Sequence, residues 1–304
     1  MYLEHFKLSK PPFSLTPNTE FYCELPTHQE ALNVLLLSLQ HGEGFIKILG
    51  EVGTGKTLLC RLLLNALDPD FVTAYIPNPD QSADSLRLSL ATELGLKPEK
   101  DLPQHQLLEA INHRLLELHK AGKKTVLLID EAQALPEMCL EAIRLLTNLE
   151  TEEKKLLQVV LFGQPELEAK LDKPSLRQLK QRITFSYTLK PLAKQELDVY
   201  LYHRLAKAGY TYGSLFSSGA KKHLYRASGG LPRLLNILCH KSMLVSYGRG
   251  ANTVDVAAVK RAIADTESAQ TTKKHRLNSN IMLVVVSGLA LSLVLAVYWK
   301  LGLL

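Results

Sequence analysis

The segment Gly50–Thr57, with the sequence GEVGTGKT, constrains the fold more than any other part of this chain. It fits the pattern G-x-x-x-x-G-K-[ST], in which glycines let the backbone wrap so that successive N–H groups point at bound phosphates. The apolar stretch Phe45–Leu49 precedes it, and an amphipathic helical pattern follows from about Thr57 to Leu67. A strand, a glycine-rich turn and a helix in this order predict a phosphate-binding loop rather than a turn with an exposed lysine.

The residue types of this loop predict ATP and Mg²⁺ as ligands. Lys56 is placed to reach the β- and γ-phosphates as a point charge, and Thr57 to supply a hydroxyl to Mg²⁺. The predicted nucleotide contacts of the loop are Gly50, Glu51, Val52, Gly53, Thr54, Gly55, Lys56 and Thr57.

A second acidic element follows the apolar run Val126–Ile129, which leads directly into Asp130 and Glu131. An apolar strand that ends in two carboxylates resembles a Walker B motif. We expect Asp130 to hold Mg²⁺ and Glu131 to polarise the attacking water. The alternative is a strand end with solvated acids, but the upstream phosphate loop favours a catalytic pair.

Alternating apolar runs and helical patterns predict an α/β domain over residues 1–190. Four further runs suit strands of a parallel sheet that is covered on both faces, namely Phe71–Ile76, Thr125–Ile129, Leu156–Phe162 and Ile183–Leu189. The segment Thr27–Glu30 is interpreted as a capping box that opens a helix. From residue 191 to residue 267 the pattern is helical only, which predicts a second, all-helical domain.

The C-terminal part of the sequence predicts a membrane anchor. Residues 268–280 are polar and basic and are interpreted as a linker, whereas the nineteen residues 281–299 carry no charge. As a helix, these nineteen residues span roughly 28 Å, close to the ~30 Å of a hydrocarbon core. Lys273, Lys274 and Arg276 precede the segment and place that side in the cytoplasm. A short tail, 300–304, follows.

Composition and charge narrow the class of protein. With 46% hydrophobic and 22% charged residues, the chain has the balance of a packed globular protein, which excludes disorder as its main state. A net charge of +6 permits contact with nucleic acid or anionic lipid without requiring either. The four cysteines are scattered, so neither a metal site nor a disulfide framework is predicted from Cys23, Cys60, Cys139 and Cys239.

Several motifs in order resemble one family of AAA+ ATPases. The strings GEVGTGKT, LLIDEAQ, LFGQPEL, LRQLKQRI and SGGLPRLLN look like the ExeA/GspA family of secretion and pilus-assembly ATPases. The leader MYLEHFKLSKPPFSLTPN and the string HQEAL also match that family. Within it, the resemblance is greatest to members that act in the biogenesis of MSHA-type pili. It covers roughly residues 1–267 and implies a P-loop NTPase of the AAA+ type with a helical lid.

The resemblance also implies roles for residues outside the two motifs. Gln164, at the end of the fourth strand, resembles the sensor-1 residue near the γ-phosphate, and Arg233, which opens a lid helix, resembles sensor 2. Arg182 resembles an arginine finger, with Arg177 as its competitor. The simpler alternatives are a polar strand-end residue for Gln164 and surface arginines for the others.

The function implied by the resemblance is that of an ATPase of the bacterial inner membrane that assists assembly of a type IV pilus or a type II secretion system. Expected partners are further copies of the chain, membrane lipid and inner-membrane components of such a machine. A DNA-dependent regulator is one alternative, but no helix-turn-helix and no interleaving of aromatic and basic residues supports it. A nucleotide-gated scaffold that barely hydrolyses ATP is another, against which Glu131 argues.

Overall fold

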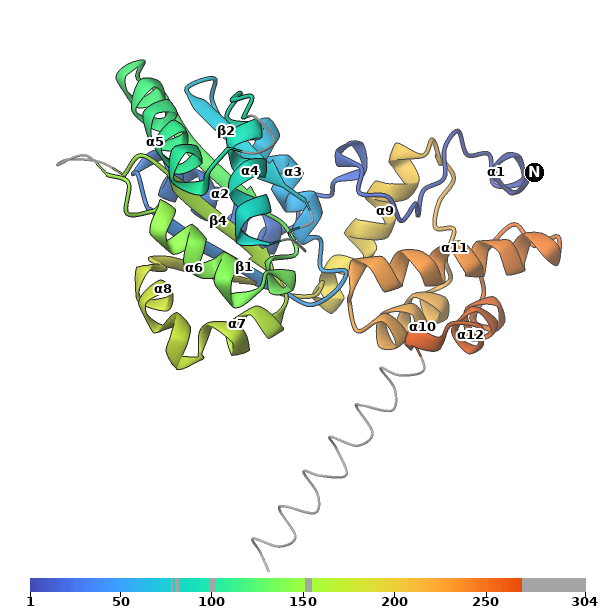
Figure 1. Ribbon diagram of the computed structural model, residues 1–304. Helices are drawn as coiled ribbons and strands as arrows, with labels where there is room; N and C mark the ends of the chain where they lie inside the picture. Colours follow the sequence, from blue (N-terminus) through green and yellow to red (C-terminus); the bar gives the residue numbers. More distant parts are fainter. Residues whose placement is uncertain (78, 80–81, 99–101, 151–154, 270–304) are drawn as a thin grey trace, which may run out of the picture. The chain divides into compact units, whose positions relative to one another are not determined.

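The chain folds into two compact units in the computed structural model, which describes residues 1–77, 79, 82–98, 102–150 and 155–269 (Figure 1). An α/β unit comprises Thr16–Pro191. A helical unit comprises Met1–Leu15 together with the described residues from Leu192 onward. Each unit has its own set of buried apolar side chains.

A five-stranded parallel sheet forms the centre of the α/β unit, in the order β2-β3-β4-β1-β5. The strands are β1 (Phe45–Gly50), β2 (Phe71–Ile76), β3 (Lys124–Ile129), β4 (Gln158–Gly163) and β5 (Phe185–Leu189). Each lies within two residues of its predicted bounds, so the strand predictions are confirmed. Because the strands run parallel, the loops that follow the neighbouring strands β3, β4 and β1 meet at the same edge of the sheet.

Helices cover both faces of this sheet, as the apolar strands predict. Along β3, Val126 and Leu128 pack into one core and Leu127 and Ile129 into the other. Fully burying such a side chain stabilises the fold by about 1.5–3 kcal/mol. The first core is completed by α2 (Pro26–Gln40) and α3 (Lys56–Ala66). The second is completed by α4 (Ala83–Glu93), α5 (Gln104–Lys120), α6 (Glu137–Leu146) and α7 (Pro165–Leu171). Shorter elements are η1 (Thr19–Phe21), η2 (Ala132–Ala134), η3 (Pro174–Leu176) and α8 (Arg177–Arg182).

The start of α2 differs from the sequence prediction. The helix begins at Pro26 with Leu25 as its N-cap and without a side-chain cap, whereas a capping box requires Thr27 in that position. Proline explains the difference, because its fixed φ and missing N–H suit the first helical position. Glu30, the other expected member of the box, instead accepts a hydrogen bond of 2.8 Å from the Tyr187 hydroxyl. The capping-box prediction is therefore wrong, and Glu30 ties α2 to β5.

The helical unit contains mainly helices, as predicted for residues 191–267. Its elements are α1 (Tyr2–His5), η4 (Lys194–Glu196), α9 (Leu197–Lys207), α10 (Ser218–Ser228), α11 (Pro232–Gly248) and α12 (Val256–Ala264). An isolated β-bridge between Phe216 and Val254 accompanies them. Helix α10 begins at an N-cap serine, Ser217, whose side chain accepts from the Ala220 N–H, and α12 begins in the same way at Asp255.

The first fifteen residues belong to the helical unit, whereas the sequence analysis assigns them to the α/β domain. Phe6 and Phe13 are buried, and the Phe13 ring contacts Phe216 edge-to-face with centroids 5.9 Å apart. The Arg204 guanidinium of α9 donates to the carbonyl oxygen of Pro12 at 2.6 Å. The α/β unit therefore begins at Thr16 and not at residue 1 as expected. The reason is that the apolar side chains of the leader pack against residues far along the chain.

The predicted membrane segment, residues 281–299, lies outside the described residues, as do the tail 300–304 and most of the predicted linker 268–280. In the part of the chain that the structure describes, no helix is both long enough and apolar enough to cross a bilayer. The membrane anchor therefore stays a prediction from the sequence.

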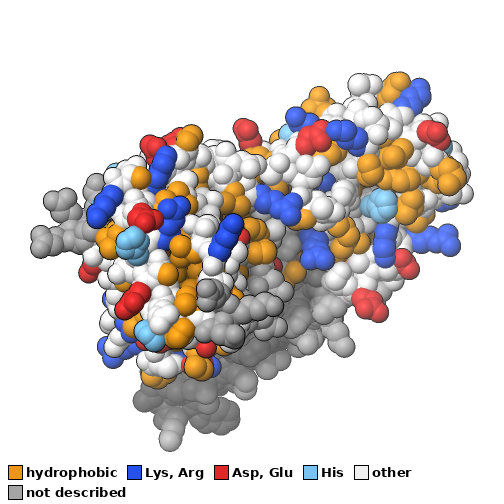
Figure 2. Space-filling model, turned by 45° about the horizontal axis from the view of Figure 1, so that its top comes forward, with side chains coloured by type: hydrophobic (Ala, Val, Ile, Leu, Met, Phe, Trp, Pro, Cys, Tyr) orange, Lys and Arg blue, Asp and Glu red, His pale blue; other side chains and the backbone are white. Residues whose placement is uncertain are grey.

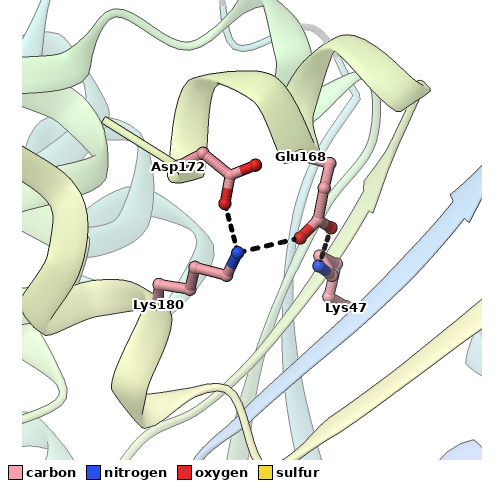
Figure 3. A network of polar contacts seen from close by, with 4 residues as sticks. All are labelled: Lys47, Glu168, Asp172 and Lys180. Atoms are coloured by element: carbon pink, nitrogen blue, oxygen red, sulfur yellow. Dashed lines mark hydrogen bonds and ion pairs between the residues drawn. The ribbon is translucent and has the colours of Figure 1, made fainter. Parts of the chain in front are cut away.

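A buried lysine interrupts the apolar pattern of β1. Lys47 is 4% exposed, and its ammonium pairs with Glu168 of α7 (Figure 3). Glu168 also pairs with Lys180 of α8 at 3.3 Å, and Lys180 pairs in turn with Asp172 at the end of α7. The hydrogen bond from Lys47 lowers the pKa of Glu168 below its ordinary value. This network joins the strand that leads into the phosphate loop to α7 and α8.

We expect Glu168→Gln to destabilise the α/β unit by about 1–2 kcal/mol, because the buried ammonium of Lys47 loses its charged partner. The cost stays moderate because water reaches part of the Glu168 carboxylate and screens the pair. Asp172→Asn is the matched control: this carboxylate lies at the exposed end of the same network, so little change is expected. Urea unfolding of both variants measures the difference, and equal effects would contradict the assignment.

The same pair predicts the pH dependence of stability. The pKa of Glu168 is lowered in the folded state, so its stabilisation is fully present above the ordinary value of 4.5. That stabilisation is lost as the pH falls through the lowered folded value. Below about pH 4.5 the parent should therefore lose stability more steeply than Glu168→Gln, which urea unfolding at stepped pH values would show.

Candidate nucleotide-binding site

The phosphate loop connects β1 to α3 at the carboxyl edge of the sheet. Gly53 and Gly55 have φ angles of +83° and +102°, a backbone region that favours glycine. A Cβ on Gly55 would lie 2.8 Å from Nε2 of His28, so the loop has no room for a side chain there. Thr54 is fully buried, and its hydroxyl donates to the carbonyl oxygen of Glu51 at 2.9 Å. These contacts hold the loop in a wrapped conformation.

Lys56 begins α3 and folds back into the loop. Its side chain is 4% exposed, and Nζ donates to the carbonyl oxygens of Gly50 at 2.8 Å and Glu51 at 3.1 Å. Burial lowers the pKa of Lys56, and the nearby carboxylates of Glu131 and Asp130 oppose that shift. The structure thus brings the ammonium of the loop close to the predicted acidic pair.

Asp130 follows β3 and is 2% exposed. Its carboxylate accepts a hydrogen bond from the Thr57 hydroxyl and another, of 2.9 Å, from the backbone N–H of Glu131. Burial raises the pKa of Asp130, although both hydrogen bonds oppose the shift. Thr57 lies on α3, so a residue from the end of β3 meets one from the helix after β1, as the sequence predicts for a magnesium site.

The Glu131 side chain takes part in a ring of hydrogen bonds with Gln133 and Gln164. The φ of Glu131, +51°, is in the left-handed region, which residues with a Cβ rarely adopt. Its Oε2 accepts hydrogen bonds from Nε2 of Gln164 at 2.9 Å and from Nε2 of Gln133. The backbone N–H of Gln164 donates in turn to Oε1 of Gln133 at 3.0 Å. The ring therefore joins the segment after β3 to the segment after β4.

Gln133 and His28 also contact the site, although the motifs of the sequence predict no role for them there. Nε2 of His28 lies 2.9 Å from the carbonyl oxygen of Thr54 in the phosphate loop. Both residues lie in strings that carry the family resemblance, LLIDEAQ and HQEAL. Their positions were visible in the sequence, but their contacts join segments that only the fold brings together.

The three predicted arginines have different surroundings. Arg182 donates through Nη1 to the carbonyl oxygen of Arg144 at 3.3 Å and to the Thr147 hydroxyl at 3.1 Å, at the C-terminal end of α6. Arg177 is exposed at the first position of α8. Arg233 is exposed at the second position of α11, in the helical unit. The α/β unit alone thus brings together the loop, Asp130/Glu131 and Gln164. Arg182 is not part of this group, because its guanidinium hydrogen-bonds at the end of α6.

The residues of the site fit a nucleotide with Mg²⁺. Asp130 and Thr57 offer the oxygen donors that Mg²⁺ prefers, and Lys56 places a cation inside the wrapped loop. Burial pushes both Lys56 and Asp130 toward their neutral forms. A bound polyphosphate and a bound cation supply the opposite charges that these two groups need.

Comparison with known proteins finds a matching domain family and a similar curated protein. Residues 39–171 match the AAA domain family. The chain is 46% identical over 254 residues to General secretion pathway protein A of Aeromonas hydrophila. The aligned region covers 84% of this chain and 46% of that protein. The chain therefore spans about half the length of this curated relative.

Two solved structures share the fold. The first is Cdc6p from Pyrobaculum aerophilum, with a TM-score of 0.66 and 18% identity over 84% of this chain and 70% of that chain. The second is the Aeropyrum pernix ORC1 protein in complex with DNA, with a TM-score of 0.64 and 18% identity over 85% and 70% of the two chains. At such identities the likeness shows the fold alone.

The strand order, the wrapped loop and the matching AAA domain make this chain a P-loop protein of the AAA+ fold. The identity to General secretion pathway protein A is far higher than the identity to those solved structures. Over 84% of its length the chain is similar to an ExeA/GspA-type AAA+ ATPase, and its residues 39–171 match the AAA domain family. The narrower resemblance to MSHA-type pilus proteins stays a prediction.

Proposed function

We propose that the chain is an ATPase, which binds ATP with Mg²⁺ and hydrolyses it to ADP and phosphate. One observation carries this proposal: the Glu131 carboxylate is held by two amides directly beside the buried pair of Lys56 and Asp130. An oriented carboxylate next to a phosphate-binding loop can act as a general base toward water. A loop that only binds nucleotide has no need of such an oriented carboxylate.

The chemistry divides among the residues of the site. Lys56 and the backbone N–H groups of the loop bind the phosphates. Asp130 and Thr57 would hold Mg²⁺, which would supply positive charge to the bound phosphates. Glu131 accepts a proton from water as the water oxygen bonds to the γ-phosphorus and the bond to the β-phosphate oxygen breaks. Gln164 donates from its amide toward the γ-phosphate.

Two arginines complete the proposed site. Arg233 is the proposed sensor-2 contact to the nucleotide, and Arg182 acts on the site of a neighbouring copy of the chain. Arg182 leaves its two hydrogen bonds at the end of α6 to do so. Arg177 is the alternative donor, since it is already exposed.

The biological role that we propose is assistance in assembling an envelope machine, a type IV or MSHA-type pilus or a type II secretion system. The name of the Aeromonas hydrophila relative, General secretion pathway protein A, supports it. Residues 281–299 anchor the chain in the bacterial inner membrane, and the ATPase faces the cytoplasm because basic residues precede the segment. Homo-oligomers and inner-membrane components of the machine are the proposed partners.

A DNA-dependent regulator is the second candidate, because one solved structure of this fold is a complex with DNA. On the face shown in Figure 2, however, Lys and Arg side chains are interspersed with acidic and hydrophobic ones. Proteins that bind DNA gather basic residues on one face and lose affinity steeply with salt. Salt-dependent DNA binding by the purified chain would favour this alternative.

The ATPase proposal makes a paired prediction. Lys56→Ala should abolish measurable ATP binding, because the buried counter-charge to the phosphates is lost. Glu131→Gln should keep ATP binding and lose turnover by about 10²–10⁴, since the base is lost while Asp130 is unchanged. Binding of a fluorescent nucleotide and release of phosphate measure the two effects. Hydrolysis by Glu131→Gln at the parent rate would contradict the catalytic assignment.

The arginine assignment is tested by mixing subunits. We expect Arg182→Ala to bind ATP but to hydrolyse it poorly, by a factor of up to about 10³–10⁵, which arginine fingers contribute in the GTPase systems where they are best measured. Subunits with Arg182→Ala keep an intact phosphate site, and subunits with Lys56→Ala keep an intact arginine. Mixed oligomers should regain activity where the two intact parts meet. No recovery despite confirmed co-assembly would exclude Arg182 as a residue acting in trans, and Arg177→Ala would be mixed next.

The membrane assignment predicts how the chain fractionates. The full chain should remain in the membrane pellet after an alkaline carbonate wash, because its apolar segment is inserted. A chain that ends at Glu267, just after α12, should appear in the supernatant and still bind nucleotide. Recovery of the full chain in the supernatant would refute the anchor.

A further inference from the structure

Gln133 lies two residues after Glu131, and the proposed chemistry gives it no part. Both ends of its amide are engaged: Nε2 donates to Oε2 of Glu131, and Oε1 accepts from the backbone N–H of Gln164 at 3.0 Å. A carboxylate only accepts hydrogen bonds and a backbone N–H only donates them. These two partners therefore fix which end of the amide faces which, and they hold Gln133 in one orientation.

The backbone around Gln133 is held as well. Gln133 lies in η2, and Nζ of Lys170 donates to the carbonyl oxygens of Gln133 at 2.7 Å and of Leu135 at 2.6 Å. Lys170 lies on α7, for which Gln164 is the N-cap. One helix therefore restrains both amides that contact Glu131. This support is consistent with the left-handed backbone of Glu131, which a residue with a Cβ keeps only where its surroundings stabilise it.

The two amides on Glu131 are not equivalent. Both donate to the same oxygen, Oε2, but the amide oxygen of Gln133 is bound to a backbone N–H at its other end. Phosphate oxygens are acceptors, so a γ-phosphate competes with Glu131 for the side-chain amide of Gln164. When that amide turns to phosphate, the carboxylate of Glu131 loses one of its orienting donors.

We propose that Gln133 is a positioning residue that keeps the Glu131 carboxylate oriented for hydrolysis when the Gln164 amide turns to the γ-phosphate. This inference rests on the proposed function. Before the exchange, both amides hold Oε2. After it, Gln133 still orients the carboxylate while Oε2 has one hydrogen-bonding position open to water. Gln164 thereby responds to the γ-phosphate, and Gln133 keeps the base in place while it does so.

The test uses the full chain with Gln133→Met, a side chain of similar length without an amide. We expect the affinity for ATP to stay within about twofold, since the hydrogen bonds of the Gln133 side chain go to Glu131 and Gln164. We expect kcat to fall about 10- to 100-fold, the usual cost of misplacing a reacting group. Gln40→Met is the matched control, because Gln40 is exposed at the end of α2, and it should match the parent.

Gln133→Glu provides a second variant of nearly the same shape. Its carboxylate cannot donate to Glu131 and repels it, so kcat should fall at least as far as in Gln133→Met. If Gln133→Met does not fold, Gln133→Glu decides the question by the same comparison of affinity and kcat. The midpoint of thermal unfolding, measured for each variant, separates loss of orientation from loss of fold.

The outcomes are distinct. A fall in kcat with unchanged ATP affinity and unchanged thermal midpoint supports the inference. A parent kcat in both Gln133 variants overturns it, and so does an equal loss of affinity and kcat, which assigns Gln133 to the folding of the site. Glu131→Gln is assayed beside them: if it hydrolyses ATP at the parent rate, the proposed function itself is wrong. If it is inactive while the Gln133 variants are normal, only this inference fails.

Discussion

The α/β unit depends on the burial of two side chains of opposite charge, Lys56 and Asp130. The rest of the unit must hold both of them away from water and close together. Burial lowers the pKa of Lys56 and raises that of Asp130, while nearby opposite charges and hydrogen bonds oppose both shifts. A parallel sheet provides such a place, because the ends of its strands meet at one edge while helices exclude water from both faces. The wrapped loop after β1 and the acids after β3 meet there, and the nucleotide is the ligand that fits.

Helix α7 holds this edge together through three separate contacts. Its N-cap, Gln164, donates to Glu131, and Lys170 donates to the backbone carbonyls of η2. Glu168 pairs with the buried Lys47 of the strand that leads into the phosphate loop. A helix of seven residues thus fixes the strand that leads into the loop, the proposed base Glu131 and Gln164, the residue proposed to contact the γ-phosphate. Such support from rigid elements is what an oriented catalytic group requires, since small misplacements cost large factors in rate.

The helical unit depends on the first residues of the chain. The buried guanidinium of Arg204 donates to carbonyl oxygens of Pro12 and Ser14, and its hydrogen bonds satisfy backbone groups that the short leader cannot pair by itself. At the turn before α11, Gly230 has a φ of +79°, and a Cβ there would lie 2.3 Å from the carbonyl oxygen of Leu192. The turn that leads to Arg233 therefore packs directly against the backbone of Leu192. This close approach leaves room only for glycine.

The sequence by itself determined the parts of this protein that rest on local pattern. Apolar runs placed the strands to within two residues, and the spacing of Gly50–Thr57 predicted the wrapped loop between β1 and α3. Tertiary structure decided the rest: that Met1–Leu15 belong to the helical unit, that Glu30 bonds Tyr187 instead of capping α2, that Arg182 is engaged at α6, and that Gln133 contacts Glu131. The reason is physical. Periodicity and motif spacing record how a segment meets solvent and its own backbone, whereas these contacts join segments that are brought together only when the cores form.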